Sequence, residues 1–330
     1  MDSPILGHKW AIELLQHQLA SDQVRHAYLF TGPEGVGRRT LALKFAQAIN
    51  CTDRTEPGKA CGKCRICQQT EKMQQVDLSI VQAETKGAMV KVDQIRALQH
   101  SLSLSPYEAR YRIALLLNFE AANANAQNAL LKTLEEAPDK VILLITASSE
   151  EELLPTIVSR CEQIRLRPLP VAQLVTVLQK QYQVIEPQAS QVAHLAGGRV
   201  GKALKLLKDQ SEKDQYQEQV EVLFELLESN LRQRFGKADG MLKAPDQAQA
   251  RARLRGYIET WISVWRDALH LANGSDTPLT NLIQQQEIQN LAAHRSPAEI
   301  LARLRTLEES LTMLDQNINP RLLLENILLD

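Results

Sequence analysis

In the first half of the chain, short apolar runs typical of buried strands are followed by stretches whose apolar residues recur at helical spacing. A short apolar run at residues 27–31 leads into a glycine-rich segment, and further apolar runs at 113–117 and 141–146 flank an alanine- and asparagine-rich stretch at about 121–136. The stretch after the glycines repeats its apolar residues at helical spacing: Leu41, Ala42, Phe45, Ala46 and Ile49. Strands that alternate with crossover helices predict an α/β module with a parallel sheet.

The strand pattern ends near residues 165–170, where two prolines interrupt it. A small helical unit follows, closed by the glycine pair 197–198 and by a short helix that reaches Leu207. The stretch 208–214 is polar and charged and is predicted to be a linker.

From about residue 215 onward, apolar residues repeat only at helical spacing, which predicts an all-helical part. The residues expected to anchor its core are Trp261, Trp265, Leu304 and Leu311. We therefore predict three parts: an α/β module at 1–166, a small helical domain at 167–208 and a helical domain at 209–330.

Composition excludes some classes of protein. A chain of 330 residues is long enough for two or three domains, and its 38 basic and 39 acidic residues nearly cancel. Bulk charge therefore does not favour a non-specific binder of nucleic acid or membrane, so any DNA contact is expected to be local. The apolar runs are too short to cross a bilayer and the start of the chain lacks a signal pattern, so we expect a cytoplasmic protein without a membrane partner.

The glycine-rich segment 32–40 has the glycine spacing of a phosphate-binding loop, in which backbone N–H groups surround phosphates at a helix N-terminus. Arg38 stands where the motif needs a lysine, and Arg39 stands where it needs a hydroxyl for magnesium. The alternative reading is a simple turn. The candidate loop residues, expected to be inactive, are Gly32, Gly35, Gly37, Arg38, Arg39 and Thr40.

The acidic residues of an ATPase site are expected at the end of the strand near residue 117. Counting back from Asn128 in the following helix, the magnesium position falls on Leu117 and the catalytic acid on Asn118, and neither side chain ionises. Phosphoryl transfer depends on positioning and on charge neutralisation by the metal. We therefore expect this chain neither to hydrolyse ATP nor to bind it.

Four of the five cysteines lie close together in the sequence, with the spacing C-x9-C-x2-C-x2-C at Cys51, Cys61, Cys64 and Cys67. Four soft ligands can close a tetrahedral structural zinc site. An iron–sulfur cluster is the chief competitor, although the further cysteine of the ferredoxin pattern is absent, and disulfides or unliganded thiols are a third possibility. Cys161 is left over and is expected to be a packing residue. The basic residues in this segment, Lys59, Lys63 and Arg65, are more often solvated than in contact with DNA or a partner.

Longer motifs lie downstream. The sequence reads NALLKTLEE at 128–136, followed by Ala-Pro, and LPTIVSRC at 154–161. Together with ILGH at 5–8, HAYLF at 26–30, the glycine loop and the cysteine cluster, these motifs resemble the clamp-loader branch of the AAA+ ATPases over nearly all of residues 1–208.

Within that branch, intact phosphate-loop residues mark the gamma/tau ATPases, and their loss makes this chain resemble the delta-prime subunits of bacterial DNA polymerase III. The nucleotide-sensing arginine of the family would fall at Gly201, beside Lys202, which is a poor substitute. The resemblance also implies that Arg160, in Ser-Arg-Cys, is an arginine finger that acts in trans on a neighbouring nucleotide. The alternative for Arg160 is a solvated ion pair, with Glu162 close by in the sequence.

For the whole chain, the resemblance implies an AAA+ module with a zinc knuckle inserted at 51–67, a helical lid and a helical collar that holds subunits in a ring. The implied role is a non-hydrolysing, comparatively rigid scaffold subunit in a pentameric loader with gamma/tau ATPases and a delta subunit. Such a loader opens the sliding clamp and places it on primed DNA. Contacts with primer-template DNA are then expected along the phosphate backbone and within the assembly.

Two rival functions remain. In the first, the chain is an active clamp-loader ATPase in which Arg38 and Thr40 suffice and Glu120 supplies the acid. In the second, it is a stand-alone zinc-dependent DNA-binding protein, which leaves the motifs at 128–136 and 159–161 unexplained.

Overall fold

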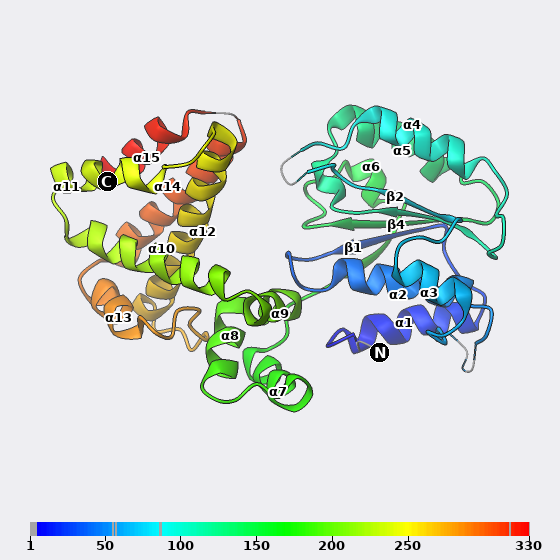
Figure 1. The fold of residues 1–330 in the computed structure, drawn as a ribbon, viewed down its shortest axis with the longest axis horizontal. Coiled ribbons are helices and arrows are strands. Elements are labelled where there is room, and N and C mark those ends of the chain that lie inside the picture. Colours follow the sequence, from blue (N-terminus) through cyan, green and yellow to red (C-terminus); the bar gives the residue numbers. More distant parts are fainter. Residues whose placement is uncertain (1–4, 55, 57, 86–87, 317, 330) are drawn as a thin grey trace. The chain divides into compact units, whose positions relative to one another are not determined.

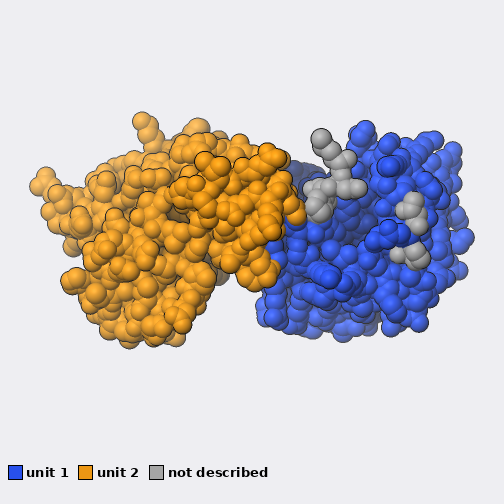
Figure 2. Space-filling view, turned by 90° about the horizontal axis from the view of Figure 1, so that it is seen from below, with its two compact units in different colours: residues 1–169, 199–202 blue, residues 170–198, 203–330 orange. Residues whose placement is uncertain are grey.

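The computed structural model describes residues 5–54, 56, 58–85, 88–316 and 318–329. The chain divides into two compact units, coloured separately in Figure 2. The first unit contains the chain up to Leu169 together with Arg199–Lys202, and the second contains Pro170–Gly198 and the chain from Ala203 onward. The division into three parts remains a prediction.

A five-stranded parallel sheet forms the centre of the first unit, with the strand order β2-β3-β4-β1-β5. The strands are β1 (Ala27–Thr31), β2 (Leu78–Val81), β3 (Arg112–Leu116), β4 (Val141–Ala147) and β5 (Glu162–Arg165). The three apolar runs found in the sequence correspond to β1, β3 and β4. They are the central strands, buried on both faces, and such strands are apolar throughout.

Helices cover both faces of this sheet, with α1, α2 and α3 on one face and α4 and α5 on the other (Figure 1). Alternate residues of β1 point to opposite faces, so Tyr28 packs on Phe45 of α2, whereas Leu29 joins the core cluster that contains Leu130 of α5. The helical elements are α1 (Lys9–Ala20), α2 (Arg38–Asn50), α3 (Arg65–Glu71), α4 (Val92–Leu102), the 3-10 helix η1 (Phe119–Ala121), α5 (Ala124–Glu135) and α6 (Pro155–Val158).

The second unit is helical in its described residues. Trp261, Trp265 and Leu304 lie in its buried core, and Leu311 is half-buried against them. The expected fold class, a parallel α/β module followed by helices, is confirmed. The helices after the sheet are α7 (Val171–Tyr182), α8 (Gln188–Ala196), α9 (Val200–Lys208), α10 (Gln210–Glu228), α11 (Leu231–Met241), α12 (Gln247–Ala272), α13 (Gln285–Ala293), α14 (Pro297–Asp315) and α15 (Pro320–Leu329).

The predicted linker at 208–214 is wrong. Lys208 ends α9 and α10 begins at Gln210, so only Asp209 lies between the two helices. The Asp209 carboxylate accepts a hydrogen bond from the N–H of Ser211 at 3.0 Å and caps α10. Polar residues on an exposed first helical turn have the same composition as a linker, which explains the error. Among the described residues, none of the helices has the length and apolar content needed to span a membrane.

A buried carboxylate fixes the turn between α4 and β3. Asp77 is fully buried, and it accepts hydrogen bonds from the N–H groups of Tyr107, Glu108 and Ala109 at 2.7, 2.9 and 2.9 Å. It also pairs with Arg112 at 3.3 Å. Burial raises the pKa of Asp77, but these hydrogen bonds outweigh it and hold the pKa below the ordinary 3.8.

We expect Asp77→Asn to lower the free energy of unfolding of the first unit by about 3 kcal/mol or more, because it leaves Arg112 buried without its counter-charge. Because the folded-state pKa is depressed, the contribution of Asp77 is present above pH 3.8 and is lost as the pH falls below it. Urea unfolding at pH 7 measures the change. The control is Asp93→Asn, whose side chain is 82% exposed; equal stability of the two variants would contradict the prediction.

Candidate functional site

The glycine loop lies between β1 and α2, which is the strand–loop–helix context of a phosphate-binding loop. Gly32, Gly35 and Gly37 have φ angles of 142°, 80° and 114°, a region that side-chain-bearing residues rarely adopt. At Gly32, a Cβ atom would also lie 2.4 Å from the carbonyl oxygen of Leu166. The predicted glycine positions are therefore required by the backbone.

Arg38 turns into the protein from the first position of α2. It is 7% exposed, its Nη2 donates to Asn118 Oδ1 at 3.3 Å, and its Nη1 lies 3.7 Å from Glu120 Oε1. Glu120 in turn accepts a hydrogen bond from Ser148 at 2.9 Å. The structure thus brings Arg38 together with two residues that follow β3.

Charge around Arg38 is dominated by carboxylates. Burial lowers the pKa of Arg38, while the nearby Glu120, Glu34 and Glu152 act in the opposite direction. Three carboxylates therefore act on one guanidinium at this end of the loop. They would repel an incoming phosphate.

Leu117 and Asn118, the residues predicted at the metal and acid positions, directly follow β3. Leu117 is buried and apolar, and Asn118 adopts a left-handed conformation with φ 49°. The N–H of Asn118 donates to Thr146 Oγ1 at 2.8 Å, which fixes its backbone. Arg39 is exposed and points to Met73, with Nη2 2.8 Å from the sulfur, and Thr40 is also exposed.

Backbone contacts close the glycine loop. The N–H of Gly201 donates to the carbonyl oxygen of Gly35 at 2.7 Å. A Cβ atom at Gly35 would lie 2.9 Å from the backbone nitrogen of Lys202, and one at Gly201 would lie 2.8 Å from the oxygen of Gly35. His8 bonds the next carbonyl, that of Val36, at 3.1 Å, so its Nε2 carries the proton. This contact could not be predicted from the sequence, because it joins residues far apart in the chain.

Arg160 lies at the other end of the sheet. Glu162 on β5 pairs with Tyr28 on β1, so Arg160 comes two residues before that level, whereas Gly32 comes four residues after it. The four residues of strand from Tyr28 to Gly32 correspond to roughly 13 Å, and Arg160 lies in the turn that precedes β5. Arg160 and the glycine loop therefore lie at opposite ends of these paired strands.

The side chain of Arg160 is 36% exposed, and its ion-pair partner is Glu135 at 2.8 Å rather than the neighbouring Glu162. Its Nη1 also donates to the carbonyl oxygen of Thr156 at 2.9 Å. Cys161 is half-buried against the core, and burial raises the pKa of its thiol to about 12, as expected of an inert packing residue.

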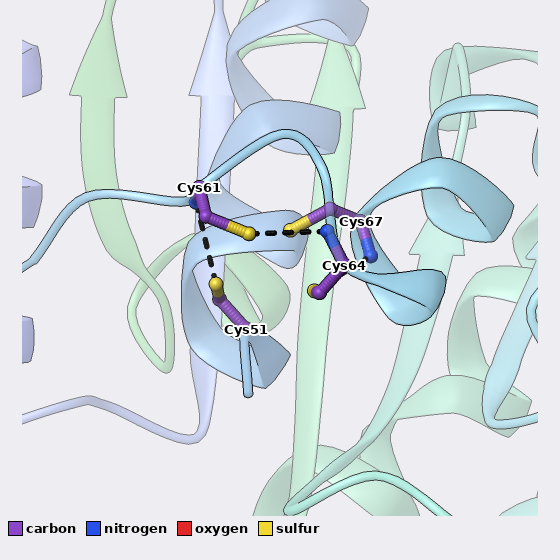
Figure 3. Close-up of side chains that lie close together, drawn as sticks. All are labelled: Cys51, Cys61, Cys64 and Cys67. Atoms are coloured by element: carbon purple, nitrogen blue, oxygen red, sulfur yellow. Dashed lines mark hydrogen bonds between the residues drawn. The ribbon is translucent and has the colours of Figure 1, made fainter. Parts of the chain in front are cut away.

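The four clustered cysteines converge after α2, and their sulfur atoms all lie within 4.8 Å of one another (Figure 3). Cys51 follows the last residue of α2, Cys64 caps the N-terminus of α3, and Cys67 lies in its first turn. Zinc–sulfur bonds of about 2.3 Å in a tetrahedron put sulfurs about 3.8 Å apart, so the cluster fits one ion after a small contraction. These residues could hold a metal ion.

Backbone N–H groups surround the sulfurs as they do in thiolate sites. The sulfurs of Cys51, Cys61 and Cys64 accept from the N–H groups of Cys61, Cys64 and Cys67 at 3.3, 3.2 and 3.4 Å. Burial raises the pKa of Cys51 and of Cys67, whereas for Cys64 hydrogen bonds from Cys67 and Thr52 outweigh burial and lower the pKa to about 6. Such hydrogen bonds stabilise the deprotonated form that binds metal.

Contacts with two helices fix the segment that carries the cysteines. Gln47 of α2 donates to the carbonyl oxygen of Cys67 at 2.8 Å, and Lys44 pairs with Glu71 at 3.5 Å, so α3 packs on the helix that begins at the glycine loop. On the other side, Gly58 has φ 77°, and a Cβ atom there would lie 2.4 Å from the backbone oxygen of Gln16 on α1. The segment that carries the cysteines is therefore packed against both α2 and α1.

Comparison with known proteins gives consistent matches. The family model described as DNA polymerase III, delta subunit, matches residues 7–170, and the model of the C-terminal part of that subunit matches residues 257–330. The DNA polymerase III subunit delta' of Bacillus subtilis is 27% identical over 323 residues, which cover 96% of this chain and 94% of the relative.

The DNA polymerase III subunit tau of Escherichia coli is 32% identical over 207 residues, which are 61% of this chain but only 32% of that protein. The chain thus spans about one third of the tau protein. A solved DNA polymerase III gamma subunit-related protein from Thermotoga maritima superposes with a TM-score of 0.52 at 17% identity and covers 96% of this chain and 97% of its own. That likeness shows the fold.

We expect Gly35→Ala to open the contact between the glycine loop and residues 199–202, because the added methyl group would lie 2.9 Å from the nitrogen of Lys202 on a backbone with φ 80°. Amide hydrogen exchange at Gly201 should then be at least about tenfold faster. Gly37→Ala is the control, since φ there is 114° but nothing lies within 4 Å of the added atom. Equal exchange in both variants would show that the contact does not protect Gly201.

Proposed function

Because the chain belongs to the DNA polymerase III clamp-loader family, in its delta-prime branch, we propose that it neither binds nor hydrolyses ATP and that it donates Arg160 to a neighbouring ATPase subunit. The observation that carries this proposal is the placement of the two arginines. Arg38 points inward at the glycine loop, whereas Arg160 stands partly exposed at the opposite end of the sheet.

The inert loop follows from the residues around Arg38. The guanidinium is already bonded to Asn118 and paired with Glu120, so it is not available to a terminal phosphate in the manner of a loop lysine. Neither Leu117 nor Asn118 can supply a carboxylate for magnesium. The nearby carboxylates and the contact between Gly35 and Gly201 add charge repulsion and steric closure.

The finger role follows from the position of Arg160. A guanidinium at the opposite end of the paired strands from its own glycine loop is useful to phosphoryl transfer only in another subunit's site. There it would stabilise charge that develops on the transferred phosphate. Its position beside the edge strand β5 makes it accessible to such a neighbour.

The partners are those expected of the family. We place this chain in a cytoplasmic complex with gamma/tau ATPase subunits and a delta subunit, which loads a sliding clamp on primed DNA. Residues 1–166, 167–208 and 209–330 would be its AAA+ module, lid and collar. The chain itself would serve as scaffold and finger donor.

The metal in the cysteine cluster is proposed to be zinc with a structural role. Four thiolate ligands complete a tetrahedral site and leave no position open for a substrate. A cluster of several iron and sulfide atoms would need wider separation of the cysteine sulfurs than a single ion does. The zinc would join the end of α2 to the start of α3.

We expect Arg160→Ala to lower ATP turnover of the assembled gamma/tau, delta and delta-prime complex at least twofold, since the neighbouring site loses a group worth roughly 10³-fold in rate. Arg165→Ala, which removes an exposed arginine from the adjacent strand, is the control and should leave turnover unchanged. The isolated chain should show no turnover with ATP and magnesium.

Measurements of ATP turnover and of DNA binding distinguish the proposed function from each rival. Unchanged turnover with Arg160→Ala would exclude the finger role. Magnesium-dependent turnover by the isolated chain would identify an active ATPase. Tight binding of primed DNA by the isolated chain would favour a stand-alone DNA-binding protein.

We expect about one zinc per chain by elemental analysis, and Cys64→Ser should lose it and unfold at a lower temperature, because metal binding contributes to folding. Cys161→Ser, which changes a thiol outside the cluster, should keep the zinc. Iron in the purified chain would instead indicate an iron–sulfur cluster, and a chain without metal would contradict the proposed site.

A further inference from the structure

Two contacts hold the guanidinium of Arg160. Its Nη2 donates to Glu135 Oε1 at 2.8 Å, and its Nη1 donates to the carbonyl oxygen of Thr156 at 2.9 Å. A guanidinium has five N–H donors, so two of them are bonded here and the fork is oriented while other donors remain for a further anion. The side chains of Arg160 and Glu135 are 36% and 51% exposed, so a ligand from outside can approach them.

The position of Glu135 is not explained by helix stability. Glu135 is the last residue of α5, and Glu136 follows it directly. The C-terminus of a helix carries partial negative charge, which disfavours carboxylates there and favours cations. Lys132 in the same turn offsets part of this charge, and Arg160 supplies a further cation from outside the helix.

Well-fixed elements carry both partners. The carbonyl oxygen of Leu134 accepts a hydrogen bond from His26 at 3.2 Å, which ties the end of α5 to the start of β1. On the other side, the N–H of Leu154 donates to Gln127 Oε1 at 2.8 Å, and Ile157 in α6 is fully buried. The pair therefore joins two segments whose backbones are already fixed, as a precisely aimed side chain requires.

We propose that Glu135 is a positioning residue that aims Arg160 at the nucleotide of the neighbouring subunit, an inference that rests on the proposed function. A free arginine side chain populates many rotamers, and ordering it costs conformational entropy. Glu135 and Thr156 order it before the neighbour arrives, so less entropy is lost when the finger engages. The Glu135 carboxylate accepts a hydrogen bond from Nη2 of Arg160 and leaves other N–H donors of the guanidinium for phosphate oxygens.

The test compares Glu135→Ala, Glu135→Gln and Glu136→Ala in the assembled complex with gamma/tau and delta. Loss of an exposed ion pair should lower kcat about two- to fivefold in Glu135→Ala, with KM for ATP unchanged. Glu135→Gln should recover part of the rate, because its amide oxygen still accepts a hydrogen bond. Glu136→Ala removes the neighbouring carboxylate and should leave kcat unchanged.

A double-mutant cycle separates positioning from a structural role. If Glu135 acts through Arg160, Glu135→Ala should have no further effect in an Arg160→Ala background. An equal fall in both backgrounds would overturn the proposal, and so would an unchanged kcat in Glu135→Ala. A rise in turnover or a lower KM would also overturn it, since Glu135 would then mask the finger. If Arg160→Ala itself has no effect, the proposed function fails instead.

Discussion

Parallel strand pairing is the constraint on which the rest of this structure depends. Because the strands are parallel, the segments that follow them all lie at one end of the sheet, and the segments that precede them all lie at the opposite end. Arg38 follows β1 by way of the glycine loop, and Arg160 precedes β5, so the register of these two neighbouring strands separates the arginines. One arginine is thereby assigned to the chain's own loop, and the other is excluded from it.

At the loop, an arginine stands where the phosphate-binding motif has a lysine. The guanidinium of Arg38 is buried and bonded to Asn118, so it is held inside the protein rather than presented to a phosphate. Glu120, which could have served as an acid, instead faces that guanidinium and Ser148. These charges are thus already paired within the folded structure.

The cysteine cluster belongs to the same layer of the structure. Cys51 ends the helix that the glycine loop begins, and Gln47 connects that helix to Cys67. A metal ion at this point would constrain the far end of α2 while the contact between Gly35 and Gly201 constrains its near end. Together they would fix both ends of the helix that follows the loop.

The sequence by itself determined the central strands, the glycine positions, the missing acids and the four cysteines, because each of these depends on local pattern and spacing. It did not reveal β2 or β5, which are strands of four residues at the edges of the sheet, too short to give a distinct pattern. In the sequence, the carboxylate close to Arg160 is that of Glu162, two residues away, whereas the folded chain brings Glu135 of α5 to it. Tertiary structure alone decided this pair and the closure of the loop by Gly201, because both join residues that only the packing of the sheet and its helices brings together.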